Sequence, residues 1–217
     1  MALEVAIAHE SDLLELMESQ FTAFDNDLYH ELLYPGGNNP EARAVAARRT
    51  LGEQEHDPSL IFLKCIDTAT GKIIGFAKWH IYDKERPESE WAQRHEVDWW
   101  EEGRKEKTLA KMFLDSMSDV RERLWQGRPH ILCGILCVHA DHHGRGAGTA
   151  LMKWGMDRAQ SLGLPCYLEA TEMGHPLYQK LGFKDVDVVE ILASQWDGDK
   201  DRRYPAMIWT PPPALLN

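Results

Sequence analysis

Residues 131–151 read ILCGILCVHADHHGRGAGTAL and contain the most informative pattern in the chain. A run of apolar residues ends at Val138, a short polar link follows, and a glycine-rich turn then opens a segment with helical apolar periodicity. This order predicts a buried strand, a loop and the N-terminus of a helix. The unpaired N–H groups and the positive dipole end of such a helix attract phosphate groups. Gly144, Gly146 and Gly148 let the backbone approach a ligand without obstruction by a Cβ atom.

Two common phosphate-binding loops do not fit this glycine pattern. A Walker loop places Lys after its final glycine, whereas Thr149 follows Gly148 in this chain. A dinucleotide-binding fingerprint requires Gly-x-Gly-x-x-Gly. Counted from Gly144, its last glycine would fall on Thr149, and counted from Gly146 it would fall on the leucine at position 151. The loop therefore belongs to a different class of phosphate site.

The composition indicates a folded protein and excludes several classes of function. The 217 residues are 43% hydrophobic, which suits a single domain spanning residues 1–217. The net charge of −11 argues against binding to nucleic acid. No apolar run is long enough to cross a membrane and no signal peptide is apparent, so we expect a cytoplasmic protein without a membrane partner. The four cysteines lie in strand-like surroundings and are expected to be buried free thiols.

The periodicity predicts a succession of strands and helices with one charged insertion. Strands are expected over residues 3–8, 60–67, 72–82, 131–138, 166–170, 184–192 and 204–210. Helices are expected after an N-cap at Ser11 and over residues 40–56, 102–125, 147–162 and 175–181. Residues 83–127 are charged and rich in tryptophan, and we interpret them as an insertion with one long helix. The polar residues 194–203 are expected to form a hairpin loop.

A short glycine pattern alone is a weak signal. It becomes specific because a second block, YLEATEMGHPLYQKLGF at residues 167–183, follows the loop at a distance of one helix and one strand. Together the two blocks resemble the pyrophosphate loop and the Tyr-x-Lys-x-Gly-Phe block of the GNAT superfamily of acyl-CoA-dependent N-acyltransferases. His143 stands where that loop usually has Gln or Arg, and Thr171 stands near the place of a frequent Asn. The resemblance is to the superfamily and is strongest over residues 136–186.

The resemblance implies a fold and a co-substrate. The implied fold is an α/β protein with a mixed, mostly antiparallel sheet whose central strands splay apart, flanked by helices. Acetyl-CoA would lie in the splayed gap, and the N–H of Val138 would donate to the oxyanion that develops on the thioester carbonyl. The implied cofactor-binding residues are Leu136, Cys137, Val138, His143, Gly144, Arg145, Gly146, Ala147, Gly148, Thr149 and Thr171.

Acetyl transfer to an amine also needs an acid and a base. Tyr178 matches the family's general acid, whose phenol protonates the departing thiolate. An ammonium acceptor must lose a proton before it can attack the thioester. Alternation along residues 166–170 places Glu169 on a polar face of its strand, and we name it as the candidate base. Glu172 and His139 are the alternatives.

The acceptor is the component that the sequence leaves open. Trp91, Trp99 and Trp100, with their acidic neighbours, would suit a cationic amine through cation–π contacts, or else would form a lid packed on the core. The histidines at positions 139, 142 and 143 crowd one turn, a poor arrangement for converging ligands, so no metal is expected. We interpret the protein as an acetyltransferase that acts directly on a primary amine of a small molecule or peptide, as a monomer or homodimer. The alternative is a non-catalytic acyl-CoA-binding or sensing module.

Overall fold

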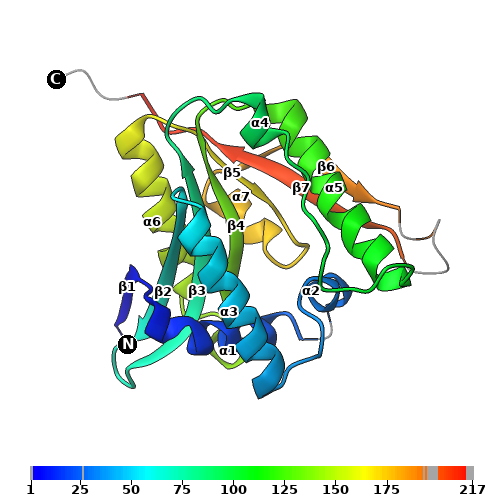
Figure 1. The fold of residues 1–217 in the computed structure, drawn as a ribbon. Helices are drawn as coiled ribbons and strands as arrows, with labels where there is room; N and C mark the ends of the chain where they lie inside the picture. Colours follow the sequence, from blue (N-terminus) through cyan, green and yellow to red (C-terminus); the bar gives the residue numbers. More distant parts are fainter. Residues whose placement is uncertain (1, 26, 193, 195–199, 214–217) are drawn as a thin grey trace.

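Seven strands form one open sheet in the computed structural model, which describes residues 2–25, 27–192, 194 and 200–213. The strand order is β1-β2-β3-β4-β5-β7-β6, and every neighbouring pair is antiparallel except β4 and β5, which are parallel (Figure 1). The predicted mixed, mostly antiparallel sheet is therefore confirmed. The strands are β1 Leu3–Ile7, β2 Leu60–Asp67, β3 Lys72–Tyr82, β4 His130–Val138, β5 Cys166–Glu169, β6 Lys184–Ile191 and β7 Arg202–Trp209.

Helices cover both faces of this sheet. Helix α6 packs on one face, where Trp79, Cys133 and Leu168 lie in its core cluster. The neighbouring residues Leu132 and Tyr167 belong to the cluster under α5, and alternation along a strand therefore places α5 on the opposite face. Helices α1 and α3 form a further cluster with β2, β3 and the end of β4. The helices are α1 Leu13–Ala23, α2 Leu28–Leu33, α3 Pro40–His56, α4 Glu88–Trp91, α5 Lys105–Trp125, α6 Ala147–Leu162 and α7 His175–Lys180.

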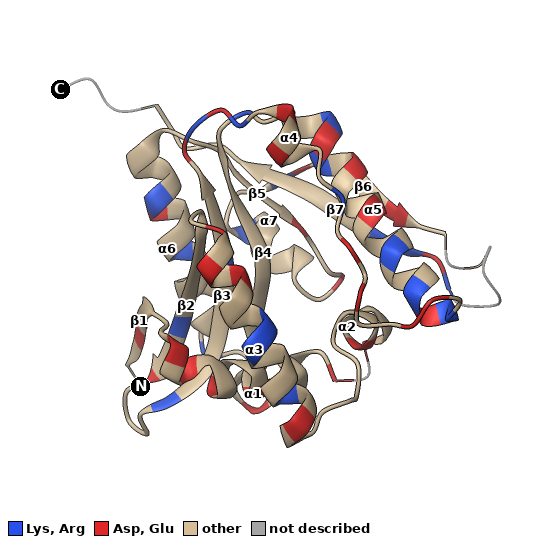
Figure 2. Ribbon diagram, viewed as in Figure 1, with Lys and Arg blue, Asp and Glu red and all other residues tan. Residues whose placement is uncertain are grey.

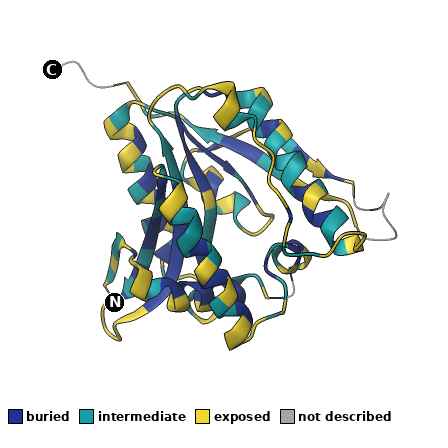
Figure 3. Ribbon diagram, viewed as in Figure 1, coloured by how far each residue is buried: buried dark blue, intermediate teal, exposed yellow. Residues whose placement is uncertain are grey.

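The long helix of the insertion is amphipathic, as predicted. Leu109, Phe113 and Val120 of α5 are buried against the sheet. Figure 2 shows many charged residues along the same helix, and Figure 3 shows that buried and exposed positions alternate along it. Burial of this apolar stripe holds the insertion against β5, β6 and β7.

Most predicted boundaries agree with the structure, and three details differ, namely the start of α1 and the short helices α2 and α4. Helix α3, strands β2 and β3, and helix α6 have the predicted ranges. Ser11 does not cap α1, because it lies inside a 3₁₀ turn over Glu10–Asp12 that is closed by a 2.8 Å hydrogen bond from the His9 N–H to Asp12 Oδ2. The six-residue α2 was not predicted. Most of the hairpin loop predicted over residues 194–203 lies outside the described residues.

A bulge at Gly134 changes which side chains of β4 face each side of the sheet. Trp79 pairs with Cys133 and Lys78 pairs with Ile135, so Gly134 is the extra residue between them. Without this insertion, Ile135 would follow Cys133 onto the α6 face. With it, Leu136 lies on the α6 face instead.

Strands β4 and β5 separate directly at this bulge. Their pairing covers only Ile131–Cys133 of β4 and Cys166–Leu168 of β5. Beyond that point β4 continues to Val138, whereas β5 ends at Glu169 and the Ala170 N–H donates to the carbonyl of Pro205. The edge of β4 between Gly134 and Val138 therefore borders an open gap, which confirms the expected splay of the central strands.

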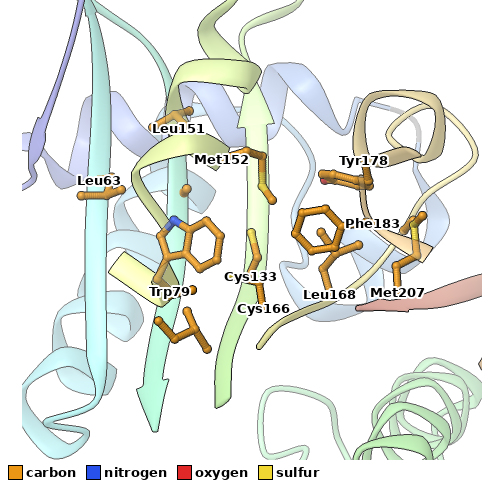
Figure 4. Packing of buried hydrophobic residues seen from close by; sticks show 14 of the residues in the cluster. Leu63, Trp79, Cys133, Leu151, Met152, Cys166, Leu168, Tyr178, Phe183 and Met207 are labelled. Carbon is orange, nitrogen blue, oxygen red and sulfur yellow. The ribbon is translucent and has the colours of Figure 1, made fainter. Parts of the chain in front are cut away.

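Close packing of α6 on the sheet requires a glycine at position 155. Trp79 is fully buried and its indole lies under α6 among the core side chains (Figure 4). A Cβ atom at Gly155 would overlap the six-membered part of that indole ring. The helix can approach the sheet closely only because residue 155 has no side chain.

We expect Gly155→Ala to lower the free energy of unfolding by about 2 kcal/mol or more, since overpacking of a core typically costs about 1–3 kcal/mol. Gly52→Ala in α3 is the matched control, because an added Cβ there meets no atom within 4 Å. It should leave stability unchanged or raise it by up to about 1 kcal/mol through helix propensity. Urea unfolding measures both, and equal stability of the two variants would contradict the packing argument.

The buried His130 makes the stability of the core depend on pH. Its ring is buried, stacks on Trp125 at a centroid distance of 4.0 Å, and places Nδ1 2.8 Å from the carbonyl oxygen of Arg128. Burial lowers the pKa of His130 to about 3, against the opposite effect of the hydrogen bond to Arg128.

Lowering the pH from 7 to 5 should therefore cost stability at His130. The unfolded chain takes up a proton near the ordinary histidine pKa of about 6.5, whereas the folded protein does not, which amounts to about 2 kcal/mol by pH 5. Urea unfolding at both pH values should show a loss that is smaller by about this amount in His130→Phe. His56→Phe, at an exposed histidine, should keep the parent response. The same pH response in the parent and in His130→Phe would refute this account.

Candidate active site

The N-terminus of α6 is built as an anion site. Gly146 is its N-cap and has a φ of 90°, and Gly144 has a φ of 74°, both in the left-handed region that favours glycine. Among the described residues, no side chain caps this helix end and its first turn carries no acidic residue. A Cβ atom at Gly144 or Gly146 would meet nothing within 4 Å, so the loop is open to a ligand. The first-turn N–H groups thus fit a diphosphate.

Two side chains hold this loop against the sheet. His143 Nε2 lies 2.8 Å from the carbonyl oxygen of Val138. Arg145 forms an ion pair of 2.7 Å with Asp67 at the end of β2, and its other terminal nitrogen lies 2.7 Å from Nδ1 of His142. The side chains of Arg145 and Asp67 are mostly buried, so this pair fixes the loop. Contact of Arg145 with a phosphate remains a prediction.

The backbone of β4 offers donors to the gap at alternate residues. The N–H of His139 donates to Ile74 on β3, and His143 approaches the carbonyl of Val138 from the other side. Alternation along a strand then directs the N–H groups of Leu136 and Val138 toward the gap and those of Cys137 toward β3. Cys137 has its side chain in the α1 cluster as well. The predicted backbone contacts therefore rest on Leu136 and Val138.

Tyr178 lies where the gap meets helix α7. Its ring is buried above Phe183 in the α6 core cluster (Figure 4). A Cβ atom at Gly174 would come within 2.9 Å of the Tyr178 ring, so glycine leaves room for this aromatic side chain. The N–H of Gly174 donates to Thr171 Oγ1 at 3.1 Å, which fixes the turn before α7. Burial raises the pKa of Tyr178 well above 10, and the phenol stays protonated at neutral pH.

A cavity of about 1300 Å³ reaches this point from the α3–α5 face of the sheet. Arg49 and Glu53 of α3 line one side of it, and Met117 and Arg121 of α5 line another. Its lining also includes Leu136, Glu169, Thr171 and Tyr178. The structure thus brings the predicted acid, the predicted base and a cofactor-binding strand to one cavity.

Glu169 is engaged by an arginine. Its carboxylate accepts from Nε of Arg121 at 2.7 Å and from a terminal nitrogen of the same guanidinium at 2.9 Å, and only 3% of its side chain is exposed. Burial alone would lower the pKa of Arg121, but the charge of Glu169 outweighs this effect and raises it. Since both carboxylate oxygens are held in a fork, the geometry favours Glu169 as an anchor for Arg121 over its predicted role as base.

Two tryptophans of the insertion pack against the protein itself. Trp99 and Trp100 both donate their Nε1–H to the carbonyl of Leu32 at 2.8 Å. The Arg49 guanidinium lies 4.5 Å from the Trp99 ring centroid and 4.4 Å from that of Tyr34. These contacts tie the insertion to α2 and α3 over the cavity, and a protein cation already occupies one aromatic face.

Sequence reasoning missed a hydrogen-bonded group on the cavity wall. His80 of β3 places Nδ1 3.0 Å from Asp57 Oδ2, and Ser59 holds the other carboxylate oxygen with its N–H at 2.9 Å and its hydroxyl at 2.6 Å. All three residues line the cavity. The available signal was a histidine in a strand rich in Ile, Phe and Trp, because Asp57 was interpreted only as the end of a helix.

The described part of the chain shows neither a metal-binding group nor a membrane-spanning helix. None of its His, Cys, Asp and Glu residues gather in groups of three or more that could hold a metal ion. None of its helices is both long enough and apolar enough to cross a bilayer. All four cysteines are free and buried, as expected.

Structural comparison finds the same fold in acetyltransferases of low sequence identity. One is described as histone acetyltransferase HPA2 and related acetyltransferase from Corynebacterium glutamicum (TM-score 0.59, 20% identity, 98% of this chain and 97% of that one). Another is a mosquito arylalkylamine N-acetyltransferase like 5b (TM-score 0.57, 17% identity, 96% of this chain and 100% of that one). A third is a phosphinothricin acetyltransferase from Sinorhizobium meliloti in complex with AcCoA (TM-score 0.56, 16% identity, 97% of this chain and 89% of that one). These likenesses establish the fold.

Sequence comparison gives shorter matches. An uncharacterized N-acetyltransferase of Schizosaccharomyces pombe is 33% identical over 77 residues, which are 36% of this chain and 32% of that protein. The probable acyltransferase SID5 of Ajellomyces capsulatus is 48% identical over 51 residues, 24% of this chain and 38% of that protein. The matched residues thus span about a third of the length of these relatives. A model described as the acetyltransferase (GNAT) family matches residues 12–183, most of the chain. Glycine loop, splayed strands and family model agree, and the chain belongs to the acetyltransferase (GNAT) family.

Proposed function

We propose that this protein transfers the acetyl group of acetyl-CoA directly to a primary amine of a small molecule or peptide. One arrangement carries the proposal: the uncapped N-terminus of α6 and the open edge of β4 lie at the same gap, and Tyr178 is buried beside it. An anion site, strand N–H donors and a protonated phenol are three of the elements that acetyl transfer from a CoA thioester requires.

The chain's own groups suit acetyl-CoA in order along the gap. The N–H groups of Ala147, Gly148 and Thr149 at the helix end would hold the pyrophosphate. From the helix end outward, the N–H of Val138 would hold the pantetheine arm and the N–H of Leu136 the thioester carbonyl, in the manner of an added strand. A donor fixed on the carbonyl oxygen stabilises the charge that develops there during attack.

The comparisons support the co-substrate and are compatible with an amine acceptor. The Sinorhizobium meliloti structure is a complex with AcCoA, and a Thermoplasma acidophilum PaiA N-acetyltransferase structure (TM-score 0.50, 14% identity) is a complex with coenzyme A. The mosquito neighbour is named for an arylalkylamine acetyltransferase. The cavity over the α3–α5 face would admit the acceptor, because it reaches Leu136 and Tyr178 from the side opposite α6.

Thr149→Glu tests the anion site. The new carboxylate would stand in the first turn of α6, where it repels phosphate but suits the helix dipole. We expect acetyl-CoA affinity to fall about tenfold or more, a loss of about 1.4 kcal/mol, while stability stays equal or rises slightly. Isothermal titration measures the affinity. Thr149→Gln, of similar size without charge, should bind as the parent does, and unchanged affinity of Thr149→Glu would place the pyrophosphate elsewhere.

Tyr178→Phe tests the chemistry. In the parent, release of CoA thiol should be measurable against a panel of polyamines, aryl amines, aminoglycosides, amino acids and basic peptides. Loss of the general acid should lower kcat by about 10²–10⁴ while acetyl-CoA binds almost as before. Tyr204→Phe, at another tyrosine of the cavity wall, should keep the parent rate.

Two results would contradict the proposal in different ways. Parent-like turnover of Tyr178→Phe would remove the phenol from the mechanism but leave the transferase. Tight acetyl-CoA binding without thiol release across the whole panel would instead indicate a module that binds or senses acyl-CoA.

A further inference from the structure

We infer that His80, positioned by Asp57, is the general base that deprotonates the acceptor amine; this inference rests on the proposed function. Neither residue belongs to the glycine loop or to the block around Tyr178. The inference follows from where His80 points, how its ring is held and what surrounds its free nitrogen.

His80 lies on the acceptor side of the sheet. Its neighbour Trp79 packs under α6, and alternation along β3 therefore turns His80 to the opposite face, where it lines the cavity. In the ladder His80 pairs with Leu132 of β4, immediately before the point at which β4 and β5 separate. An acceptor that enters through the cavity would thus meet His80 beside the gap.

The bulge leaves space at the second nitrogen of this ring. A Cβ atom at Gly134 would lie 3.7 Å from both Nε2 and Cδ2 of His80, so Nε2 faces the one residue of β4 that has no side chain. The bulge that opens the gap therefore also clears the approach to His80 Nε2.

The hydrogen bonds of His80 fix its tautomer. Asp57 Oδ2, at 3.0 Å, can only accept a proton, so Nδ1 carries the hydrogen and Nε2 keeps its lone pair. Ser59 donates twice to Asp57 Oδ1 and prevents rotation of the carboxylate. Asp57 also follows directly on the last residue of α3, which anchors its backbone. This is the arrangement of an oriented base.

The surroundings keep His80 neutral at physiological pH. Burial lowers the pKa of His80; the hydrogen bond to Asp57 opposes this, and the positive charges of Lys78 and Arg121 add to it. Burial alone would raise the pKa of Asp57, but hydrogen bonds from His80 and Ser59 outweigh it and keep the pKa below its ordinary value. The other titratable groups around the ring are Tyr82, stacked at 5.6 Å, and Glu53, His95 and His130.

Each proton that moves in this reaction has a donor and an acceptor. His80 Nε2 takes one proton from the ammonium and passes it to water in the cavity. The freed lone pair attacks the thioester carbon and forms the C–N bond while the C=O π electrons move onto the oxygen. The C=O bond then reforms as the C–S bond breaks, Tyr178 protonates the departing thiolate, and the second proton of the nitrogen restores the Tyr178 phenol. The products are the amide, CoA thiol and one proton released to solvent.

His80→Gln is the direct test, with kcat/KM for the best acceptor of the panel as the measurement. We expect a fall of about 10²–10⁴, with acetyl-CoA affinity unchanged because the co-substrate lies on the other face. Imidazole added to His80→Ala should restore part of the rate. His30→Gln is the control, since His30 also lines the cavity but places its Nε2 3.1 Å from the side-chain nitrogen of Gln20.

Asp57→Asn tests the positioning role through the pH profile. In the parent, kcat/KM should rise as pH increases through the pKa of His80. Loss of the carboxylate removes support for the imidazolium, so the rising limb should move to lower pH and the rate should fall. A purely structural role of Asp57 would change stability but leave the limb in place.

Histidine nitrogen NMR of the free protein gives a readout that needs no acceptor. We expect His80 at pH 7 to be protonated on Nδ1 only; a proton on Nε2 would overturn the inference. In the kinetic test, if the parent is active and His80→Gln has the same kcat/KM, the assignment of His80 as the base is overturned but the proposed function stands. A parent that releases no CoA with any acceptor overturns the proposed function and the base with it.

Discussion

The unpaired edge of β4 is the constraint on which the rest of the site depends. A partly buried strand edge with free N–H groups is costly unless something satisfies it. Here β5 leaves β4 after Cys133, His143 approaches the carbonyl of Val138, and the N–H groups of Leu136 and Val138 then border the gap. The loop of His143, the end of α6 and the ring of Tyr178 are all arranged around this edge. Under the proposed function, the extended pantetheine arm of acetyl-CoA would pair with these groups.

Local chemistry explains why much of the fold was predictable from the sequence. Helix α3 begins at Pro40 behind the cap Asn39, and α6 ends at Gly163 in a left-handed conformation. These signals lie within a few residues of the boundary that they set. The short α2 lacked periodicity because it has only six residues. The bulge at Gly134 was not predictable, because it depends on the register against β3 and not on the residues of β4 alone.

The residues of the site likewise fall into those that local sequence predicts and those that it does not. The glycine loop and Tyr178 lie in contiguous blocks, so pattern and spacing could indicate them. The partners of Arg145 and Glu169 could not be inferred, since Asp67 and Arg121 are 78 and 48 residues away. Asp57 and His80 are 23 residues apart and meet only because α3 ends where β3 passes. Pairings of this kind come from tertiary structure and leave no local signal.

The burial of the four cysteines bears on the order of events during turnover. Burial raises the pKa of Cys137 to about 12, and that of Cys133 also rises well above its ordinary value. A thiol that stays protonated is a poor nucleophile and does not accept an acyl group at neutral pH. The α6 loop lies on one face of the sheet and the cavity opens on the other. Under the proposed function, acetyl-CoA and the acceptor would therefore enter separately and be bound together in a ternary complex, and inhibitors that join the two halves would fill both entrances at once.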